Sequence, residues 1–269
     1  MITKTRNFTQ VQSLLYEDEL INSPMIRLLA TLGLDIEIWL DSAPTSNGVL
    51  FIQSPCSGTW DAAQYPLNWK RVWIQSLSTY GVDALIERLP NHHELLFKFH
   101  RPWMATYLAQ RLELERKLTL FYFTLTLSDF VDRRRHNVTQ FTTDPTAQAA
   151  ELLKNSGRSV DNLRQTFAHP DAAVFGILQE GQLVSGAFVE PRTKRTMEIC
   201  SVYTHENYRG QGLAASVVSA ATHWILEQGK FPVYATRTTN AVSMHLAQSI
   251  GYMKYGQVEH YYCPSISNI

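Results

Sequence analysis

Two glycines, Gly210 and Gly212, have the spacing that most clearly indicates chemistry in this sequence. They separate a β-like run ending in Val-Tyr-Thr from an amphipathic segment that begins Leu-Ala-Ala. Glycine has no Cβ atom to keep an anion away from the backbone, so several N–H groups can converge on one oxyanion. The helix expected to follow adds the positive end of its dipole. The turn is therefore predicted to bind phosphate, and the alternative is a pair of glycines that only permit a tight strand-to-helix connection.

The residues on either side of this turn fit coenzyme A. Residues 209–214 would supply convergent donors for its diphosphate. The pantetheine arm resembles a peptide and can pair with an open strand edge through backbone hydrogen bonds.

The order of elements expected over residues 138–262 resembles the GNAT superfamily of N-acetyltransferases. Residues 209–214, Arg-Gly-Gln-Gly-Leu-Ala, match the superfamily's Q/R-x-x-G-x-G/A loop. Downstream, Asn240, Ser243 and the pair Gly251-Tyr252 look like its N-x-x-S and G-F/Y ending. The resemblance implies a site for acetyl-CoA or another acyl-CoA that is formed by Val202, Thr204, Arg209, Gly210, Gln211, Gly212, Leu213, Ala214, Ala215, Asn240 and Ser243.

The layout of the whole chain looks more like the glycine N-acyltransferase-like branch of that superfamily. In this branch, an N-terminal domain of degenerate GNAT type precedes the active domain. The resemblance implies an N-terminal, GNAT-like α/β domain over residues 1–133 and an acyl-CoA-binding GNAT domain over residues 134–269. The basic run at residues 133–135 is expected to mark the boundary.

Acyl transfer to an amine needs a group that takes the ammonium proton, and Glu198 is the candidate base. It precedes Arg209 by the same spacing as the proposed base of glycine N-acyltransferase-like enzymes. A salt-bridged structural glutamate is the alternative. Strict alternation puts Glu198, Cys200 and Val202 on one face of the strand, and a bulge would break that pattern. Cys200 as an acyl-cysteine nucleophile is the weaker alternative to a buried packing residue.

The general acid is not assigned by the sequence. Many members of the superfamily have a tyrosine seven residues after the asparagine, but here Ala247 occupies that position. Water, Ser243 or a nearby tyrosine could protonate the leaving thiolate, and His245 is a further candidate, although such a histidine is more often structural. The same departure keeps open a catalytically silent, CoA-binding regulatory protein.

Four residues in the first half are of types that bind metal ions: His92, His93, Glu94 and His100. Their spacing, however, does not suit a metal site. On a strand, His92 and Glu94 would face one way and His93 the other, and His100 lies far along the chain. No metal is therefore expected.

The first half alternates helix and strand patterns, as an α/β or α+β domain does. Helices are expected at residues 9–32, 80–89 and 103–111, and strands at residues 35–40, 49–52, 95–99 and 118–127. Residues 54–66 have the composition of a loop, and residues 69–74 fit either a strand or the start of a helix.

The second half is expected to hold the elements that position the glycine turn. Strands are expected at residues 138–142, 174–178, 183–189, 197–204, 231–236 and 253–262. Helices are expected at residues 145–155, 159–168, 212–228 and 240–250. These patterns predict a mixed α/β (α+β) sheet protein, and the resemblance implies a GNAT fold in its C-terminal half.

Composition and charge limit the class of protein. Lys plus Arg and Asp plus Glu number 24 each, so the net charge is zero and lacks the electrostatic footprint of a nucleic-acid-binding protein. Three distant cysteines indicate a reducing compartment. No stretch approaches the roughly 20 apolar residues that span a bilayer. A cytoplasmic protein is expected, with neither nucleic acid nor membrane as a partner.

The acceptor is expected to be a small-molecule or peptide amine that attacks the thioester directly in a ternary complex. A longer acyl donor, as in amino-acid N-acyltransferases, stays open, and so does a first half that recognises a partner protein. The acyl length, the acceptor and the oligomeric state are undecided by the sequence.

Overall fold

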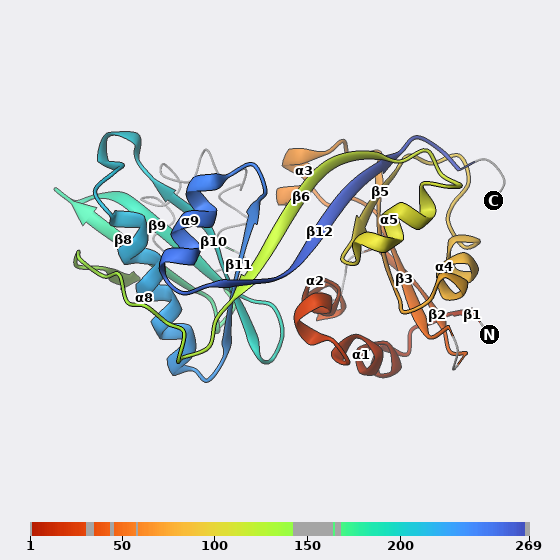
Figure 1. The fold of residues 1–269 in the computed structure, drawn as a ribbon, viewed down its shortest axis with the longest axis horizontal. Helices are drawn as coiled ribbons and strands as arrows, with labels where there is room; N and C mark the ends of the chain where they lie inside the picture. The colour runs from red at the N-terminus through yellow and green to blue at the C-terminus, as the bar shows by residue number, and fades with distance from the viewer. Residues whose placement is uncertain are drawn as a thin grey trace. The chain divides into compact units, whose positions relative to one another are not determined.

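Figure 1 shows the computed structural model of the chain, which describes residues 2–30, 35–43, 46–57, 59–141, 164 and 168–266. The chain forms two compact units that interleave along the sequence. Unit 1 comprises Met1–Ser57, Tyr65–Leu120 and Gly256–Ile269. Unit 2 comprises Gly58–Gln64 and Phe121–Tyr255.

Two long strands contribute residues to both units: β6 (Glu115–Thr124) and β12 (Met253–Cys263). Each unit therefore consists of segments that are not continuous in the sequence, and no single position in the chain divides one unit from the other. The boundary expected between residues 133 and 134 concerns sequence domains and stays a prediction.

The sheet of unit 1 is mixed. Its first strands are β1 (Ile2–Lys4), β2 (Ile36–Asp41), β3 (Gly48–Gln53), β4 (Lys70–Ser76) and β5 (Leu95–Phe99). Strands β1 to β4 pair antiparallel in chain order, β5 is parallel to β4, and β12 is antiparallel to β5. Of the two interpretations of residues 69–74, the strand is therefore the correct one.

Helices cover both faces of this sheet, as the contacts of successive residues in β3 show. Val49 and Phe51 pack in a cluster with α1 (Phe8–Tyr16) and α2 (Glu19–Ala30). Leu50 and Ile52 pack instead with α4 (Thr79–Ile86) and α5 (Pro102–Leu108). Successive side chains of a strand point to opposite faces, so the two helix pairs cover opposite sides of the sheet.

The single helix expected over residues 9–32 is wrong, because the structure has two helices there. Helix α1 ends at Tyr16 and α2 begins at Glu19. The side chain of Asn22 donates a hydrogen bond to the backbone oxygen of Leu15 at 2.9 Å, which joins the start of α2 to the end of α1. A short helix, α3 (Trp60–Gln64), also lies in the stretch expected to be a loop.

Unit 2 repeats the pairing scheme of unit 1. Strands β7 (Thr139–Phe141), β8 (Ala173–Gln179), β9 (Gln182–Pro191) and β10 (Thr196–Thr204) pair antiparallel in chain order. Strand β11 (Phe231–Arg237) is parallel to β10. In both units four strands pair antiparallel in chain order, and a fifth strand is parallel to the fourth. The GNAT-like character of the first domain stays a prediction.

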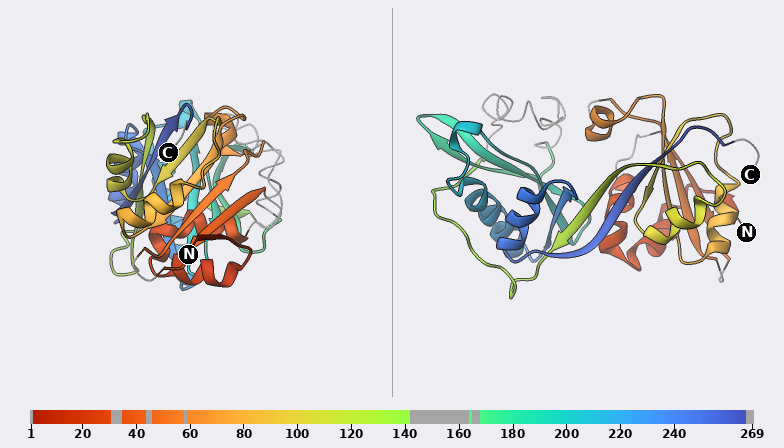
Figure 2. Two further views of the ribbon diagram at one scale, coloured as in Figure 1. Left: turned by 90° about the vertical axis from the view of Figure 1, so that its right-hand side faces the viewer. Right: turned by 45° about the horizontal axis from the view of Figure 1, so that its top comes forward.

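Two helices position the candidate site of unit 2: α8 (Leu213–Glu227) and α9 (Ala241–Ser249). They lie side by side in Figure 1 and Figure 2, and their apolar side chains share one core cluster with Met197 and Ile199 of β10. The sequence predicted both helices, and both are confirmed. The helices expected at residues 145–155 and 159–168 fall almost wholly outside the described residues.

None of the helices in the described part of the chain is long and apolar enough to cross a bilayer.

Candidate functional site

The parallel strands β10 and β11 separate before either strand ends. Their paired residues run from Thr196 opposite Phe231 to Ile199 opposite Tyr234. Beyond that point β10 continues to Thr204 and β11 continues to Arg237. The separation offers one strand edge on each side to an extended ligand.

A β-bulge interrupts β10 at this separation. The pairing of β10 with β9 shifts between Cys200 and Tyr203, and Ser201 has a positive φ of 51°. Val202 packs against the core cluster of α8, whereas Cys200 and Tyr203 pack against a smaller cluster. The expectation that Glu198, Cys200 and Val202 share one face is therefore wrong for Val202, because the extra residue of the bulge reverses the alternation.

The glycine turn has the backbone geometry that an anion-binding loop needs. Gly210 and Gly212 both have a φ of 78°, in the left-handed region that favours glycine. A Cβ atom added at either glycine would meet no described atom within 4 Å, so this side of the loop is open. Gly212 is the N-cap of α8 and brings no capping side chain, and the first turn of α8 carries no acidic residue. An anion would therefore meet N–H groups there without a competing carboxylate.

The residues next to the two glycines differ in their burial. Leu213 is buried in the core cluster beneath α8. Gln211 is exposed, and the small side chains of Ala214 and Ala215 are half-buried. The structure thus brings the predicted residues of the turn together at the start of one helix, and the burial of Leu213 fixes where that helix begins.

Arg209 and Thr204, two further predicted binding residues, brace the end of β10. Arg209 Nε donates to the backbone oxygen of Thr204 at 3.2 Å, and its guanidinium lies 5.6 Å from the ring centre of Tyr203. The hydroxyl of Thr204 lies 2.8 Å from the hydroxyl of Ser185 on β9. These contacts stabilise the junction between the strand and the glycine turn.

Asn240 and Ser243, also predicted to contact the ligand, lie at the start of α9. The side-chain oxygen of Asn240 accepts a hydrogen bond from the backbone N–H of Ser243 at 3.1 Å, and so caps the helix. The hydroxyl of Ser243 lies 2.9 Å from that of Tyr234, which belongs to the last pair of β10 and β11. Burial raises the pKa of Tyr234, so its hydroxyl stays protonated near neutral pH. Among the described residues, Tyr234 is thus a tyrosine whose hydroxyl contacts that of Ser243.

Two other positions on α9 bear on proton transfer. Ala247, where the resembling superfamily has a tyrosine, is fully buried in the core cluster. His245 is exposed to solvent. Ser243, whose hydroxyl lies 2.9 Å from that of Tyr234, remains the candidate hydroxyl group on α9.

Glu198 is buried and ion-paired. Arg192 contacts Oε2 of Glu198 through Nε at 2.8 Å and through Nη2 at 2.5 Å, and the two side chains are 11% and 8% exposed. Glu190 stands opposite Glu198 in the pairing of β9 with β10. One carboxylate oxygen of each glutamate and the sulfur of Cys200 lie within 4.8 Å of one another. Such a group of ligand atoms can hold a cation, and here the guanidinium of Arg192 supplies the positive charge.

Tyr122 on β6 completes this cluster. The guanidinium of Arg192 lies 5.8 Å from its ring centre. Burial raises the pKa of Tyr122 to about 12, although the positive charge of Arg192 opposes the shift. Sequence reasoning missed Glu190, Arg192 and Tyr122, because strand pairing alone brings them to Glu198. Counting back from the turn between β9 and β10 identifies Glu190, since the pairing there is regular as far as Cys200.

The histidine-rich segment of unit 1 is a turn. His92 has a φ of 59° and precedes β5. The ring Nδ1 of His93 lies 2.8 Å from the backbone oxygen of Asn91, and Glu94 accepts a hydrogen bond from the hydroxyl of Tyr262 at 2.6 Å. The premise that these residues alternate along a strand is therefore wrong.

Comparison with known protein families matches residues 165–261 to the model described as GNAT acetyltransferase. This stretch contains the separating strands, the glycine turn and both helices of the site. No curated protein matches the sequence. The family match supports acyl transfer as the general activity.

Several solved structures are similar along nearly the whole chain. A Drosophila protein has a TM-score of 0.67 at 13% identity, with 97% of this chain and 98% of that protein covered. A tandem GNAT protein from the clavulanic acid biosynthesis pathway has a TM-score of 0.64 at 12% identity, with coverage of 100% and 99%. An acetyltransferase of the GNAT family from Colwellia psychrerythraea has a TM-score of 0.64 at 11% identity, with coverage of 98% and 99%. At these identities the likeness shows the fold alone, which is a GNAT fold.

Proposed function

We propose that this GNAT-fold protein is an N-acetyltransferase, which binds acetyl-CoA in unit 2 and transfers the acetyl group to an amine. The observation that carries the proposal is the glycine turn, where two left-handed glycines open α8 directly after a strand that leaves its parallel neighbour. The start of the helix suits the diphosphate, and the separated strand edges suit the pantetheine arm. The family match over residues 165–261 supports the same function.

The proposed reaction is a direct attack of the amine on the thioester in a ternary complex. The nitrogen of the neutral amine forms a bond to the carbonyl carbon, the C–S bond breaks, and the sulfur leaves as the thiolate of CoA. The acceptor enters as an ammonium ion, so one proton must be removed before the attack. The nitrogen loses a second proton as the amide forms, and the leaving thiolate gains one, so the whole reaction releases one proton.

Glu198 is the proposed acceptor of the amine proton, either directly or through a water molecule. It lies just before the bulge of β10, where the strands separate. Arg192 holds its carboxylate in one orientation through two contacts to Oε2. Glu190 is a second buried carboxylate in the same cluster, with an oxygen within 4.8 Å of one of Glu198.

Ser243 is the proposed donor to the thiolate, with Tyr234 behind it. The two hydroxyls form a pair at 2.9 Å, and Ser243 is the more exposed of the two. As Ser243 gives up its proton, the hydroxyl of Tyr234, which its raised pKa keeps protonated, can donate a hydrogen bond to the oxygen of Ser243. Ser243→Ala is therefore expected to lower kcat while the Kd of acetyl-CoA changes little.

Calorimetric titration with acetyl-CoA, followed by thiol release in the presence of pooled amines, tests the proposal. Binding together with release supports an acyltransferase. Repeating the titration with longer acyl-CoAs distinguishes an acetyltransferase from an amino-acid N-acyltransferase, since only the latter needs room for a longer chain. If the titration detects no binding of any acyl-CoA, this function is excluded.

A second function is favoured by the state of Glu198. A carboxylate that already forms an ion pair, together with the buried Ala247 in the usual tyrosine position, is compatible with a CoA-binding regulatory protein that lacks catalysis. The same two measurements separate the functions. Tight binding of acetyl-CoA without thiol release from any amine would favour the regulatory protein.

A further inference from the structure

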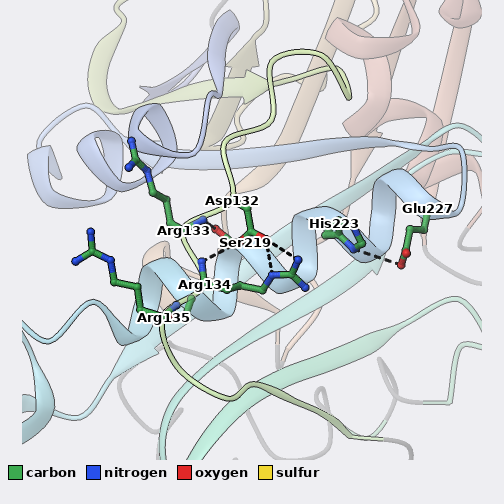
Figure 3. A network of polar contacts seen from close by, with 8 residues as sticks. Asp132, Arg133, Arg134, Arg135, Ser219, His223 and Glu227 are labelled. Carbon is green, nitrogen blue, oxygen red and sulfur yellow. Dashed lines mark hydrogen bonds and ion pairs between the residues drawn. The ribbon is translucent and has the colours of Figure 1, made fainter.

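A basic segment, residues 132–136, packs along α8 (Figure 3). The sequence predicts a domain boundary at its arginines, but the backbone there is bound to the helix. The N–H of Arg133 donates to the hydroxyl of Ser219, and the N–H of Arg135 donates to the hydroxyl of Ser216, each at 3.0 Å. Both serines are fully buried. Since they lie three positions apart on α8, the basic segment runs along the helix toward its N-terminus.

At the end of this path, His136 reaches the glycine turn. Its Nε2 lies 2.8 Å from the backbone oxygen of Gln211. In a planar trans peptide the C=O and the following N–H point in opposite directions. A carbonyl of Gln211 that faces His136 therefore turns the N–H of Gly212 to the other side. A neutral imidazole with its proton on Nε2 can donate this bond, so no positive charge on His136 is required.

The three arginines of the basic segment differ in what their side chains contact. Arg134 donates to Oδ2 of Asp132 through Nε at 2.8 Å and through Nη2 at 2.5 Å. Arg133 donates through Nε to the backbone oxygen of Ser249 at 2.8 Å. Among the described residues, Arg135 has a bond only through its backbone N–H, and Figure 3 shows its side chain directed away from α8. Arg135 thus adds a positive charge that no described carboxylate neutralises.

An acyl-CoA would need such a charge at the start of α8, because its nucleotide carries a diphosphate and a 3′-phosphate. The guanidinium of Arg209, the arginine of the turn itself, is bound to the end of β10. Arginine binds phosphate oxygens through short, charge-assisted hydrogen bonds. We infer that Arg135 and His136 of the basic segment belong to the acyl-CoA site, in which His136 positions the glycine turn and Arg135 binds the nucleotide phosphates, whereas Arg134 is bound to Asp132 and takes no part. This inference rests on the proposed function.

The test compares a donor that carries phosphate with one that does not. Acetyl-CoA and S-acetylpantetheine share the same thioester, but only acetyl-CoA has the nucleotide. Arg135→Gln should raise the Kd of acetyl-CoA roughly tenfold, as expected for the loss of a charge-assisted hydrogen bond. The matched control is Arg134→Gln, which removes the same charge from an arginine that Asp132 already binds. It should change this Kd by no more than about twofold.

His136 is tested in the same way as a positioning residue. His136→Ala should weaken the binding of acetyl-CoA roughly tenfold, because the loop loses the bond that orients it. His136→Gln should recover most of that affinity, since its amide N–H can donate to the same carbonyl of Gln211. The kcat/KM with S-acetylpantetheine should be the same in the wild type and in all four variants. A purely structural role would lower it together with the affinity for acetyl-CoA.

Each outcome decides between the inference and the proposed function. A loss that is confined to acetyl-CoA supports the basic segment as a phosphate site. Equal affinities of Arg135→Gln and Arg134→Gln, or equal losses with both donors, would overturn the inference and leave the proposed function intact. A wild-type protein that binds no acetyl-CoA would overturn the proposed function, and the inference with it.

Discussion

Replacing Gly212 by glutamate is expected to abolish the binding of acetyl-CoA, and Gly181 offers a matched control. Gly212 has a φ of 78° and Gly181, in the turn between β8 and β9, has a φ of 79°. A Cβ atom at either glycine would meet no described atom within 4 Å. The substitution therefore imposes the same left-handed strain at both positions, about 1–2 kcal/mol of unfolding free energy. For a chain of this length, both variants should lose roughly 2–8 °C in Tm.

The two variants should differ only in affinity, because only the carboxylate at Gly212 would face the phosphates. At a separation of about 5 Å and an effective dielectric constant near 20, two unit charges repel by about 3 kcal/mol. That repulsion corresponds to a loss of affinity of about a hundredfold for each phosphate charge. The bulk of the new side chain adds to it.

Isothermal titration calorimetry with acetyl-CoA measures the affinity of both variants, and differential scanning calorimetry verifies that their losses in Tm are alike. The expected result is wild-type affinity for Gly181→Glu and undetectable binding for Gly212→Glu. If Gly212→Glu binds acetyl-CoA as tightly as Gly181→Glu does, the phosphate groups do not lie at this turn.

Three further substitutions test the rest of the site. Glu198→Gln should leave the Kd of acetyl-CoA unchanged and lower kcat by roughly a hundredfold, because an amide cannot accept the amine proton; an unchanged kcat in the thiol-release assay would exclude Glu198 as the base. Tyr122→Phe should reduce the amount by which the free energy of unfolding falls at alkaline pH. The pKa of Tyr122 is raised by burial to about 12, above the value of about 10 for an unfolded tyrosine, so the folded chain keeps a proton that the unfolded chain loses. The stability that depends on Tyr122 is therefore fully present below about pH 10 and falls by about 1.4 kcal/mol for each pH unit up to about pH 12. Urea unfolding of the wild type and of Tyr122→Phe across this range measures it, and parallel losses in the two proteins would contradict the assignment. Ala247→Tyr should lower the free energy of unfolding by at least about 1–3 kcal/mol without raising kcat, because Ala247 is fully buried; a rise in kcat would mean that the missing tyrosine limits the reaction.

Local chemistry made much of the site predictable. The glycine turn was expected because glycine spacing, a preceding strand and a following amphipathic helix are all neighbours in the sequence. The short helix that begins near Asn240 was also expected, and the bond by which Asn240 caps α9 spans only three positions. Helix α8 and strand β5 begin and end close to their expected bounds, because their apolar periods and terminal residues are local signals.

Contacts between distant segments were not predictable in this way. Glu198 was singled out, but its ion pair with Arg192 arises from a turn between paired strands. The bulge at Ser201 sends Val202 to the opposite face, and the alternation of residue types carries no sign of it. The end of α1 at Glu17 could not be predicted from the sequence, because apolar residues keep a helical spacing on both sides of it.

By itself the sequence determined the class of fold, the order of most elements and the loop that starts α8, since propensity, apolar period and glycine chemistry act over a few neighbouring residues. Only the tertiary structure decided that β12 pairs with β5 and that the basic segment follows α8 to the glycine turn. The physical reason is that hydrogen bonds such as that of His136 with Gln211 join residues far apart in the chain. They form only where the packing of both segments brings donor and acceptor together.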